Sequence, residues 1–288
     1  MSRKSRKAAS KKKARGKHKG QRSGPSMAEL ADRHVLYQES VQNPEFESDF
    51  IDDTFRDLTG RVPASMREDF AGTAISSCTW VAKRERNTAV AVDIDGEVLD
   101  WGREHNVAAL TPEQQSRVSL IKGDVLTVET APVDVLQAYN FSYWIFKERS
   151  QMLEYFRRCH KAIKTDGLLF LDVFGGFEAY QSQKEKRKLD GFSYVWEQAD
   201  FNAVTHEVNC AIHFRFPDKS KLDNAFTYSW RVWGAREIRE VLADAGFRET
   251  IIYRQMFDED TDEALDEYEP TDFAEDYACW LGYIVARP

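Results

Sequence analysis

The 288-residue sequence lacks the features that mark several protein classes. No apolar run approaches the roughly 18 residues of a membrane-spanning helix, and the N-terminus has no apolar segment of a secretory signal. The four cysteines form no C-x-x-C pair, which argues against a zinc ribbon or a disulfide framework. Neither a metal-ligand spacing nor a Ser-His or His-Asp arrangement can be recognised. We therefore expect a cytoplasmic protein that binds no metal and no membrane.

Acidic residues are missing from residues 1–26, which hold eleven of the 40 Lys and Arg residues. Residues 27–288 contain the other 29 basic residues and all 48 acidic residues, so this part has a net charge of -19. Without aromatic or branched aliphatic side chains, residues 1–26 cannot bury enough apolar area to fold, so we predict a disordered basic tail. It is either a solubilising tail or an arm for non-specific contact with RNA or an acidic surface.

From residue 27 the pattern becomes globular and alternates helices with short apolar strands. Amphipathic helices are predicted over 28–37 and 48–58, and a long helix is predicted over 145–163. Strands are predicted at the end of the chain as well, over 248–255 and 278–286. In the first half, apolar strands over 88–92, 117–122, 133–138 and 168–173 are separated by helical stretches. This alternation predicts a Rossmann-like, doubly wound α/β fold.

After Gly176 the apolar residues alternate with a period of two. The clearest run contains Val208, Cys210, Ile212 and Phe214, which is typical of half-buried antiparallel strands. We predict that these strands form a small antiparallel β cap inserted into the α/β core. Eleven acidic residues over 258–276 predict a solvated loop near the C-terminus.

Small and polar residues follow three of these predicted strands, and a similar segment ends a further candidate strand at Met66 and Arg67. Because the carboxyl ends of parallel strands form the edge where such sheets bind ligands, these residues are expected to converge. An Asp in this position is also a common helix N-cap, a role that Asp95 fits. The segments are Glu68-Asp69-Phe70-Ala71-Gly72-Thr73-Ala74, Asp93-Ile94, Gly123-Asp124-Val125, and Asn140 with Tyr143.

Together these segments resemble the motifs of class I S-adenosylmethionine-dependent methyltransferases, especially small-molecule N-methyltransferases, over roughly residues 30–288. The resemblance implies that Glu68 faces the methionine amino group and Gly72 lines the methionine moiety. It also implies that Asp93 holds the ribose hydroxyls, that Ile94 belongs to the cofactor-binding residues, and that Asp124 and Val125 hold adenine. The implied parts are residues 27–62 as N-terminal helices, 63–176 as the cofactor-binding core, 190–233 as the cap, and 234–288 as a C-terminal helix and strands.

The first motif departs from the family because Phe70 and Ala74 replace two of its three glycines. Phe70 would crowd the usual approach of the cofactor. A dinucleotide-binding oxidoreductase also places an acid after its second strand, but it needs those glycines for the pyrophosphate. S-Adenosylmethionine has no phosphates, so the loss favours methyl transfer.

On the acceptor side, Tyr37, Asn140 and Tyr143 are candidate catalytic residues that would align the acceptor. The alternative for the two tyrosines is plain packing. If the polar face of the cap lines the cavity, His213, Arg215 and Arg231 would bind an anionic group of the substrate. The alternative is that this face meets only water.

The expected function is therefore S-adenosylmethionine-dependent methylation of a small or medium acceptor at nitrogen or oxygen. One alternative is a methyltransferase of RNA or of a ribosome-associated protein, guided by the basic tail. Another is a degenerate methyltransferase fold that serves as an RNA-associated binding module. A further hypothesis is that the acidic segment 258–276 competes with nucleic acid for the tail.

Overall fold

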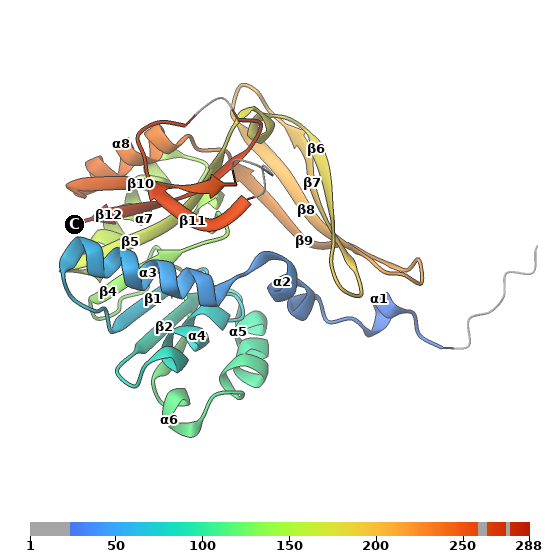
Figure 1. Cartoon of the computed structure of the whole chain (residues 1–288), viewed down its shortest axis with the longest axis horizontal. Coiled ribbons are helices and arrows are strands. Elements are labelled where there is room, and N and C mark those ends of the chain that lie inside the picture. Colours follow the sequence, from blue (N-terminus) through green and yellow to red (C-terminus); the bar gives the residue numbers. More distant parts are fainter. Residues whose placement is uncertain (1–23, 259–263, 275–276) are drawn as a thin grey trace, which may run out of the picture.

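The computed structural model of the chain describes residues 24–258, 264–274 and 277–288 (Figure 1). The predicted disorder of the tail therefore concerns residues that lie mostly outside the described part, as do seven residues of the acidic segment. Within the described residues, no helix is long and apolar enough to cross a membrane.

A mixed eight-stranded sheet forms the core, with the order β11-β10-β12-β5-β4-β1-β2-β3. The five strands from β1 to β5 are parallel, and β10 to β12 join them in antiparallel fashion. The order reverses between β4 and β1, which is the position where open α/β sheets bind ligands. The strands are β1 Ser65–Asp69, β2 Thr88–Asp93, β3 Val118–Lys122, β4 Val133–Ala138, β5 Ile163–Gly175, β10 Glu249–Phe257, β11 Ala264–Pro270 and β12 Trp280–Arg287.

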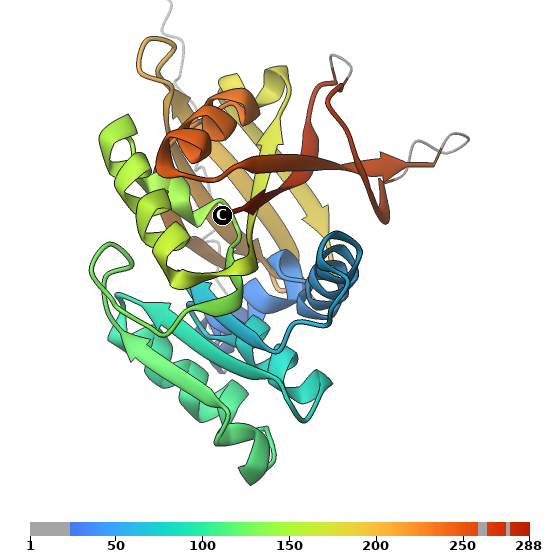
Figure 2. The same ribbon diagram turned by 90° about the vertical axis from the view of Figure 1, so that its left-hand side faces the viewer.

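Helices cover both faces of this sheet because its buried strands carry apolar side chains on both sides. On β5, Leu168 and Phe170 pack in the cluster that contains α3 (Pro44–Thr59) and α4 (Ile75–Lys83). Leu169 and Leu171 pack on the other face, with α7 (Arg149–Ala162) and α8 (Ala235–Ala245). Figure 2 shows α3 on one side of the sheet and the α7–α8 pair on the other. The predicted doubly wound fold is confirmed.

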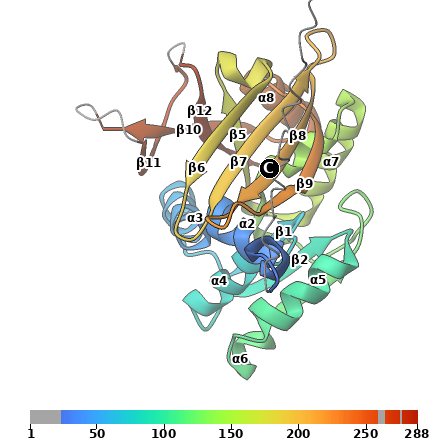
Figure 3. The ribbon, with the colours of Figure 1, turned by 90° about the vertical axis from the view of Figure 1, so that its right-hand side faces the viewer.

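A second, four-stranded antiparallel sheet is inserted between β5 and α8, as predicted (Figure 3). Its order is β6-β7-β8-β9, and the short 3₁₀ helix η3 (Phe177–Tyr180) leads into it. The edge strand β6 was not predicted, because all six of its residues are polar or charged and show no apolar alternation. The strands are β6 Gln183–Lys188, β7 Ser193–Phe201, β8 Glu207–Arg215 and β9 Lys221–Arg231.

Three local predictions are wrong. The helix expected over 28–37 is two helices, α1 (Met27–Leu30) and α2 (Arg33–Val41), because Ala31 is extended and Asp32 caps α2 by accepting from the His34 amide. Ile145 is exposed at the end of the 3₁₀ helix η2 (Ser142–Ile145), before α7 begins. The acidic segment is not entirely loop, since β11 pairs with β10.

The remaining helices follow β2. They are α5 (Gly96–Gly102), which Asp95 caps by accepting from the Glu97 amide, the π-helical turn η1 (Arg103–Val107), and α6 (Pro112–Gln115). The N-cap role expected of Asp95 is thus confirmed.

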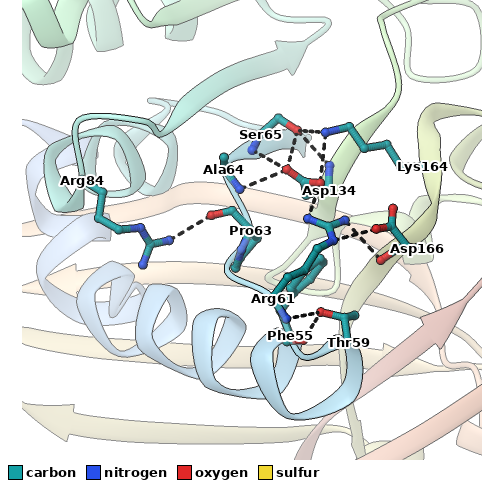
Figure 4. A network of polar contacts seen from close by, with 10 residues as sticks. All are labelled: Phe55, Thr59, Arg61, Pro63, Ala64, Ser65, Arg84, Asp134, Lys164 and Asp166. Atoms are coloured by element: carbon teal, nitrogen blue, oxygen red, sulfur yellow. Dashed lines mark hydrogen bonds and ion pairs between the residues drawn. The ribbon is translucent and has the colours of Figure 1, made fainter.

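A polar network ties the amino-terminal ends of β1, β4 and β5 together (Figure 4). The buried Asp134 carboxylate accepts hydrogen bonds from the amides of Ala64 and Ser65 at 3.0 and 2.9 Å. It also pairs with Arg61 at 2.8 Å and with Lys164 at 3.0 Å. Buried polar groups need hydrogen-bond partners, and these contacts provide them for Asp134, so the network stabilises this edge of the sheet.

Candidate active site

Asp93, at the carboxyl end of β2, joins two loops at the other edge of the sheet. One carboxylate oxygen accepts from the Gly72 amide at 2.7 Å, and the other accepts from the Asp95 amide at 2.9 Å. Burial raises the pKa of Asp93 in spite of these bonds. Since each carboxylate oxygen has two acceptor sites, Asp93 keeps capacity for a ligand.

The loop after β1 has an unusual backbone. Phe70, Gly72 and Ala74 all adopt left-handed conformations, with φ of 57°, 54° and 56°. Apart from Gly72 and its two chain neighbours, no atom of the described residues lies within 4 Å of the position that a Cβ on Gly72 would take, so the backbone is open there. The Phe70 ring packs against Phe146 and Tyr155, with centroids 6.1 and 5.6 Å apart. Phe70 also lines the cleft that opens beside this loop, so the crowding expected of it stays a prediction.

A cleft of about 500 Å³, here called the core cleft, opens beside this loop. The core contributes Gly72, Thr73 and Asp93 to its walls, and α2 contributes Arg33, His34 and Tyr37. The strand β9 closes the other side with Phe226, Tyr228 and Trp230.

A second space of about 320 Å³, the cap cavity, lies against the inner face of the four-stranded sheet. Seven aromatic side chains line it, and the Gln183 and Gln198 side chains are hydrogen-bonded to each other at 3.2 Å. Among the described residues that line it, Glu185 is the only carboxylate. The aromatic walls are Tyr37, Phe141, Phe174, Tyr194, Trp196, Tyr228 and Trp230.

Four residues line both the core cleft and the cap cavity, and we call them the shared wall: Tyr37, Asn140, Tyr228 and Trp230. Burial, together with the neighbouring Tyr228, holds the pKa of Tyr37 well above 10. The phenol therefore stays protonated at neutral pH and can only donate or accept a hydrogen bond, not act as a base.

The backbone around Asn140 is also strained. Asn140 and Phe141 are both left-handed, with φ of 58° and 54°. The Phe141 amide donates to the Asp172 carboxylate at 2.9 Å, and burial raises the pKa of Asp172 to about 8. Consecutive left-handed residues persist only where surrounding contacts hold them, and such corners cluster at functional sites.

Helix α2 bridges the core and the cap over the core cleft. Toward the core, Gln38 donates to the Thr73 hydroxyl at 2.7 Å, and Trp101 donates to Asp32 at 2.8 Å. Toward the cap, the rings of Tyr37 and Phe226 lie 4.8 Å apart. This helix therefore limits the access of water to the space between the two sheets.

Solved structures with this architecture are numerous, although no protein-family model and no curated protein matches the sequence. A methyltransferase from Clostridium acetobutylicum, described as S-adenosylmethionine-dependent, is 14% identical, with a TM-score of 0.63 over 88% of this chain and 97% of that one. The chain has the S-adenosylmethionine-dependent methyltransferase fold.

Two sugar-modifying enzymes show the same methyltransferase fold. An amino pentose methyltransferase from Micromonospora echinaspora, solved with S-adenosylmethionine bound, is 11% identical, with a TM-score of 0.60 over 88% of this chain and 96% of that one. A sugar N-methyltransferase from Streptoalloteichus is 12% identical, with a TM-score of 0.58 over 90% and 94%. At such low sequence identities, the structural similarity shows a shared fold only.

Some residues expected at the cofactor lie outside the core cleft of this methyltransferase fold. Glu68 is buried and accepts from the Ser77 amide and hydroxyl at 3.0 and 2.6 Å, and burial raises its pKa to about 8. It therefore holds α4 and does not face the cleft. Ile94 is 69% exposed, and Val125 is buried. Asp124 accepts from the Leu126 amide at 2.9 Å in a turn next to the end of β2.

Tyr143, expected to align the acceptor, is fully buried, and its hydroxyl donates to the Asp172 carbonyl at 2.7 Å. The alternative of plain packing therefore describes it. Tyr37 and Asn140, by contrast, lie in the shared wall.

The expected substrate-binding face of the cap is corrected as well. His213 is buried between Glu197, at 2.8 Å, and the Asn224 amide. Arg215 pairs with Asp223 at 2.6 Å on the outer face of the cap. Arg231 pairs with Glu237 at 2.6 Å and covers the Trp233 ring. None of the three lines the core cleft or the cap cavity.

The sequence does not predict the cap cavity, because inward-facing aromatic residues of the cap alternate along its strands with polar residues such as Arg231. Tyr194 and Trp196 on β7, and Tyr228 and Trp230 on β9, form the aromatic face that turns inward. The excess of aromatic over aliphatic residues on these strands is the sequence feature that could have indicated a cavity on this face. Within the described residues, no group of three or more His, Cys, Asp or Glu side chains could hold a metal ion.

Proposed function

We propose that the protein is an S-adenosylmethionine-dependent methyltransferase that methylates a small or medium acceptor at nitrogen or oxygen. The observation that supports this most directly is the shared wall, where a cleft at the sheet edge meets an aromatic cavity in the cap. The core cleft would take the cofactor, and the cap cavity would take the acceptor. The amino pentose methyltransferase and the sugar N-methyltransferase of the same fold support the assignment.

The residues of the core cleft fit this cofactor. Asp93 offers carboxylate acceptors for ribose hydroxyls at the end of β2, and the open backbone at Gly72 admits a ligand closely. The loop lacks the glycines that a pyrophosphate requires, which disfavours a dinucleotide. The aromatic faces of Tyr37, Tyr228 and Trp230 suit a cationic group, because a ring face attracts positive charge.

When bound, S-adenosylmethionine supplies a methyl group on a sulfonium that is a good leaving group. The protein's own task is then to align the acceptor and to exclude water. Asn140 lies in the shared wall on a constrained backbone, so its amide is fixed where it can orient the attacking atom. Helix α2 closes this space, and Glu185 in the cap cavity can receive a proton from an acceptor that arrives protonated.

The cap cavity also limits the acceptor. About 320 Å³ is in the range of small-molecule sites and is too small for a folded macromolecule. Its aromatic walls and paired glutamines favour an acceptor with apolar or ring-shaped parts and a few polar groups.

Calorimetry with S-adenosylmethionine and with its demethylated product tests the proposal. Binding of both ligands to the folded protein is expected, and absence of both would overturn the assignment. A screen of metabolite pools for a mass gain of one methyl group then identifies the acceptor.

A further inference from the structure

The outer face of the cap carries a basic groove, on the opposite side of the sheet from the cap cavity. Five cationic side chains line this groove of about 430 Å³, here called the lysine groove: Lys184, Lys186, Arg215, Lys219 and Lys221. Cross-strand register places them on one face, since Lys186 opposes Val195 and Arg215 opposes Lys221. The residues between them along the strands, such as Glu185 and Tyr194, line the cap cavity.

The charge of the lysine groove is only partly compensated. Lys184 pairs with Glu197 at 2.7 Å, and Arg215 pairs with Asp223 at 2.6 Å. Among the described residues, the ammonium groups of Lys186, Lys219 and Lys221 have no acidic partner within ion-pair distance. The groove thus carries three uncompensated cations, although residues 27–288 have a net charge of -19.

The N-terminal segment is fastened beside this groove. The Met27 amide donates to Asp218 at 3.1 Å, and the Ala28 amide donates to the Ser220 hydroxyl at 3.0 Å. Both acceptors belong to the turn between β8 and β9, which also carries Lys219. Figure 1 shows α1 next to the end of this hairpin. The eleven basic residues of the N-terminal segment therefore join the chain at the edge of the lysine groove.

We propose that the lysine groove binds the phosphate backbone of a nucleic acid. Lysine ammonium groups act as point charges that neutralise phosphates and release counterions. Among the described residues that line the groove, Phe216 is the only aromatic one and it is buried, so these residues offer no stacking platform and binding is expected to be insensitive to sequence. A membrane surface is disfavoured, because residues 1–23 contain no aromatic or branched aliphatic side chain to insert.

This proposal does not rest on methyltransferase activity. The groove and the cap cavity lie on opposite faces of one sheet, so a nucleic acid and a small acceptor can be bound together. The nucleic acid would then determine where the enzyme resides and would not be its substrate.

Fluorescence anisotropy of the full chain with a labelled oligouridine of about 20 nucleotides tests the groove. The variant Lys186→Glu/Lys219→Glu/Lys221→Glu is expected to weaken binding at least about tenfold. It should also reduce the slope of log affinity against log salt by about 2, since each single-strand phosphate contact contributes about 0.7. A matched charge reversal of exposed residues elsewhere is the control: Arg86→Glu/Arg157→Glu/Lys161→Glu should weaken oligouridine binding by less than about threefold.

Four results decide the matter. Weaker oligouridine binding by the groove variant but not by the matched control supports the proposal. The corresponding Lys→Gln triple variant should lose less affinity than the charge-reversal variant. Equal losses in both charge-reversal variants would show a general charge effect and overturn the proposal. Unchanged binding in the groove variant would also overturn it, even if deletion of residues 1–23 abolished binding. Equally tight binding of polyglutamate or of phosphatidylserine vesicles would overturn the nucleic-acid assignment.

Discussion

The two edges of the eight-stranded sheet use acidic residues in opposite ways. At the amino-terminal edge, Asp134 is satisfied by backbone amides, a lysine and an arginine, and no acceptor site is left over. At the carboxyl edge, Asp93 holds two loops through one hydrogen bond to each oxygen and still borders an open cleft. The first arrangement stabilises the fold, and the second keeps binding capacity.

The loops at the carboxyl edge also have an unusual backbone conformation. In two loops at the carboxyl edge, five of the described residues have a positive φ: Phe70, Gly72, Ala74, Asn140 and Phe141. Such conformations cost free energy that regular structure elsewhere must supply. We infer that mutations at the amino edge change mainly stability, whereas mutations at the carboxyl edge change mainly ligand binding and turnover.

The largest effect is expected at the amino edge. Asp134→Ala should lower the free energy of unfolding by about 3–5 kcal/mol, because it leaves buried donors and the Arg61 and Lys164 charges without their acceptor. Urea denaturation measures this loss. Asp166→Ala is the matched control, since Asp166 pairs with the same Arg61 at 2.6 Å but is largely exposed. It should cost less than about 1 kcal/mol.

The same network predicts a pH dependence. Burial alone would raise the pKa of Asp134, but hydrogen bonds from Ser65 and Ala64 and the Lys164 ammonium outweigh it and lower the pKa. A lowered folded-state pKa contributes stability above the unfolded value of about 3.9, and that stability is lost as the pH falls through the folded value. The stability difference between the wild type and Asp134→Asn should therefore be constant near neutral pH and narrow below about pH 4. A difference that widened in acid would contradict this account.

The next largest effect belongs to the carboxyl edge. Asp93→Ala should weaken binding of S-adenosylmethionine by roughly 2 kcal/mol, because it removes charge-assisted hydrogen bonds. Calorimetry measures the change, and Asp100→Ala on α5, which lies outside the core cleft, should leave the affinity unaltered. A variant that lost stability but bound the ligand normally would place Asp93 among the structural acids and break the contrast between the edges.

The strand ends at the carboxyl edge could be predicted from the sequence because their signals are local, but of the six residues expected at the cofactor only Gly72 and Asp93 line the core cleft. An apolar strand that ends in Asp93, and a small-residue turn at Gly72, identify strand ends wherever the rest of the chain folds. Phe70 shows the limit of this reasoning. The sequence suggests an obstacle to the cofactor but does not show that the Phe70 ring contacts Phe146 and Tyr155 while Phe70 still lines the core cleft.

The cap was predicted as a sheet, but its functional face was not. A period of two shows which residues share a face, yet it does not show which face is covered by other elements. Contacts with α2 and β12, distant in sequence, cover the face with Tyr194 and Trp196 and leave Arg215 outside. The polar strand β6 carried no apolar signal at all and is defined by its pairing with β7.

A smaller effect is expected at Asn140, where backbone and side chain can be separated. Asn140→Gly keeps the left-handed conformation without strain and removes the amide. Turnover should fall roughly tenfold, and stability should change by less than about 0.5 kcal/mol. His206→Gly is the control, because His206 is also left-handed but lies outside both cavities. Equal loss of turnover in the two variants would attribute the effect to the backbone alone.

The smallest effect sharpens the role of the shared wall. Tyr37→Phe removes one hydroxyl beside Tyr228 and keeps the aromatic face that packs on Phe226. We expect kcat/KM to fall by an amount equivalent to about 0.5–1.5 kcal/mol of transition-state stabilisation, since only one hydrogen bond is affected. The melting temperature should change little. Tyr180→Phe, which removes a hydroxyl outside both cavities, serves as the control. If Tyr37→Phe instead lowered the melting temperature and spared kcat/KM, Tyr37 would be a packing residue like Tyr143, and the alignment of the acceptor would fall to Asn140.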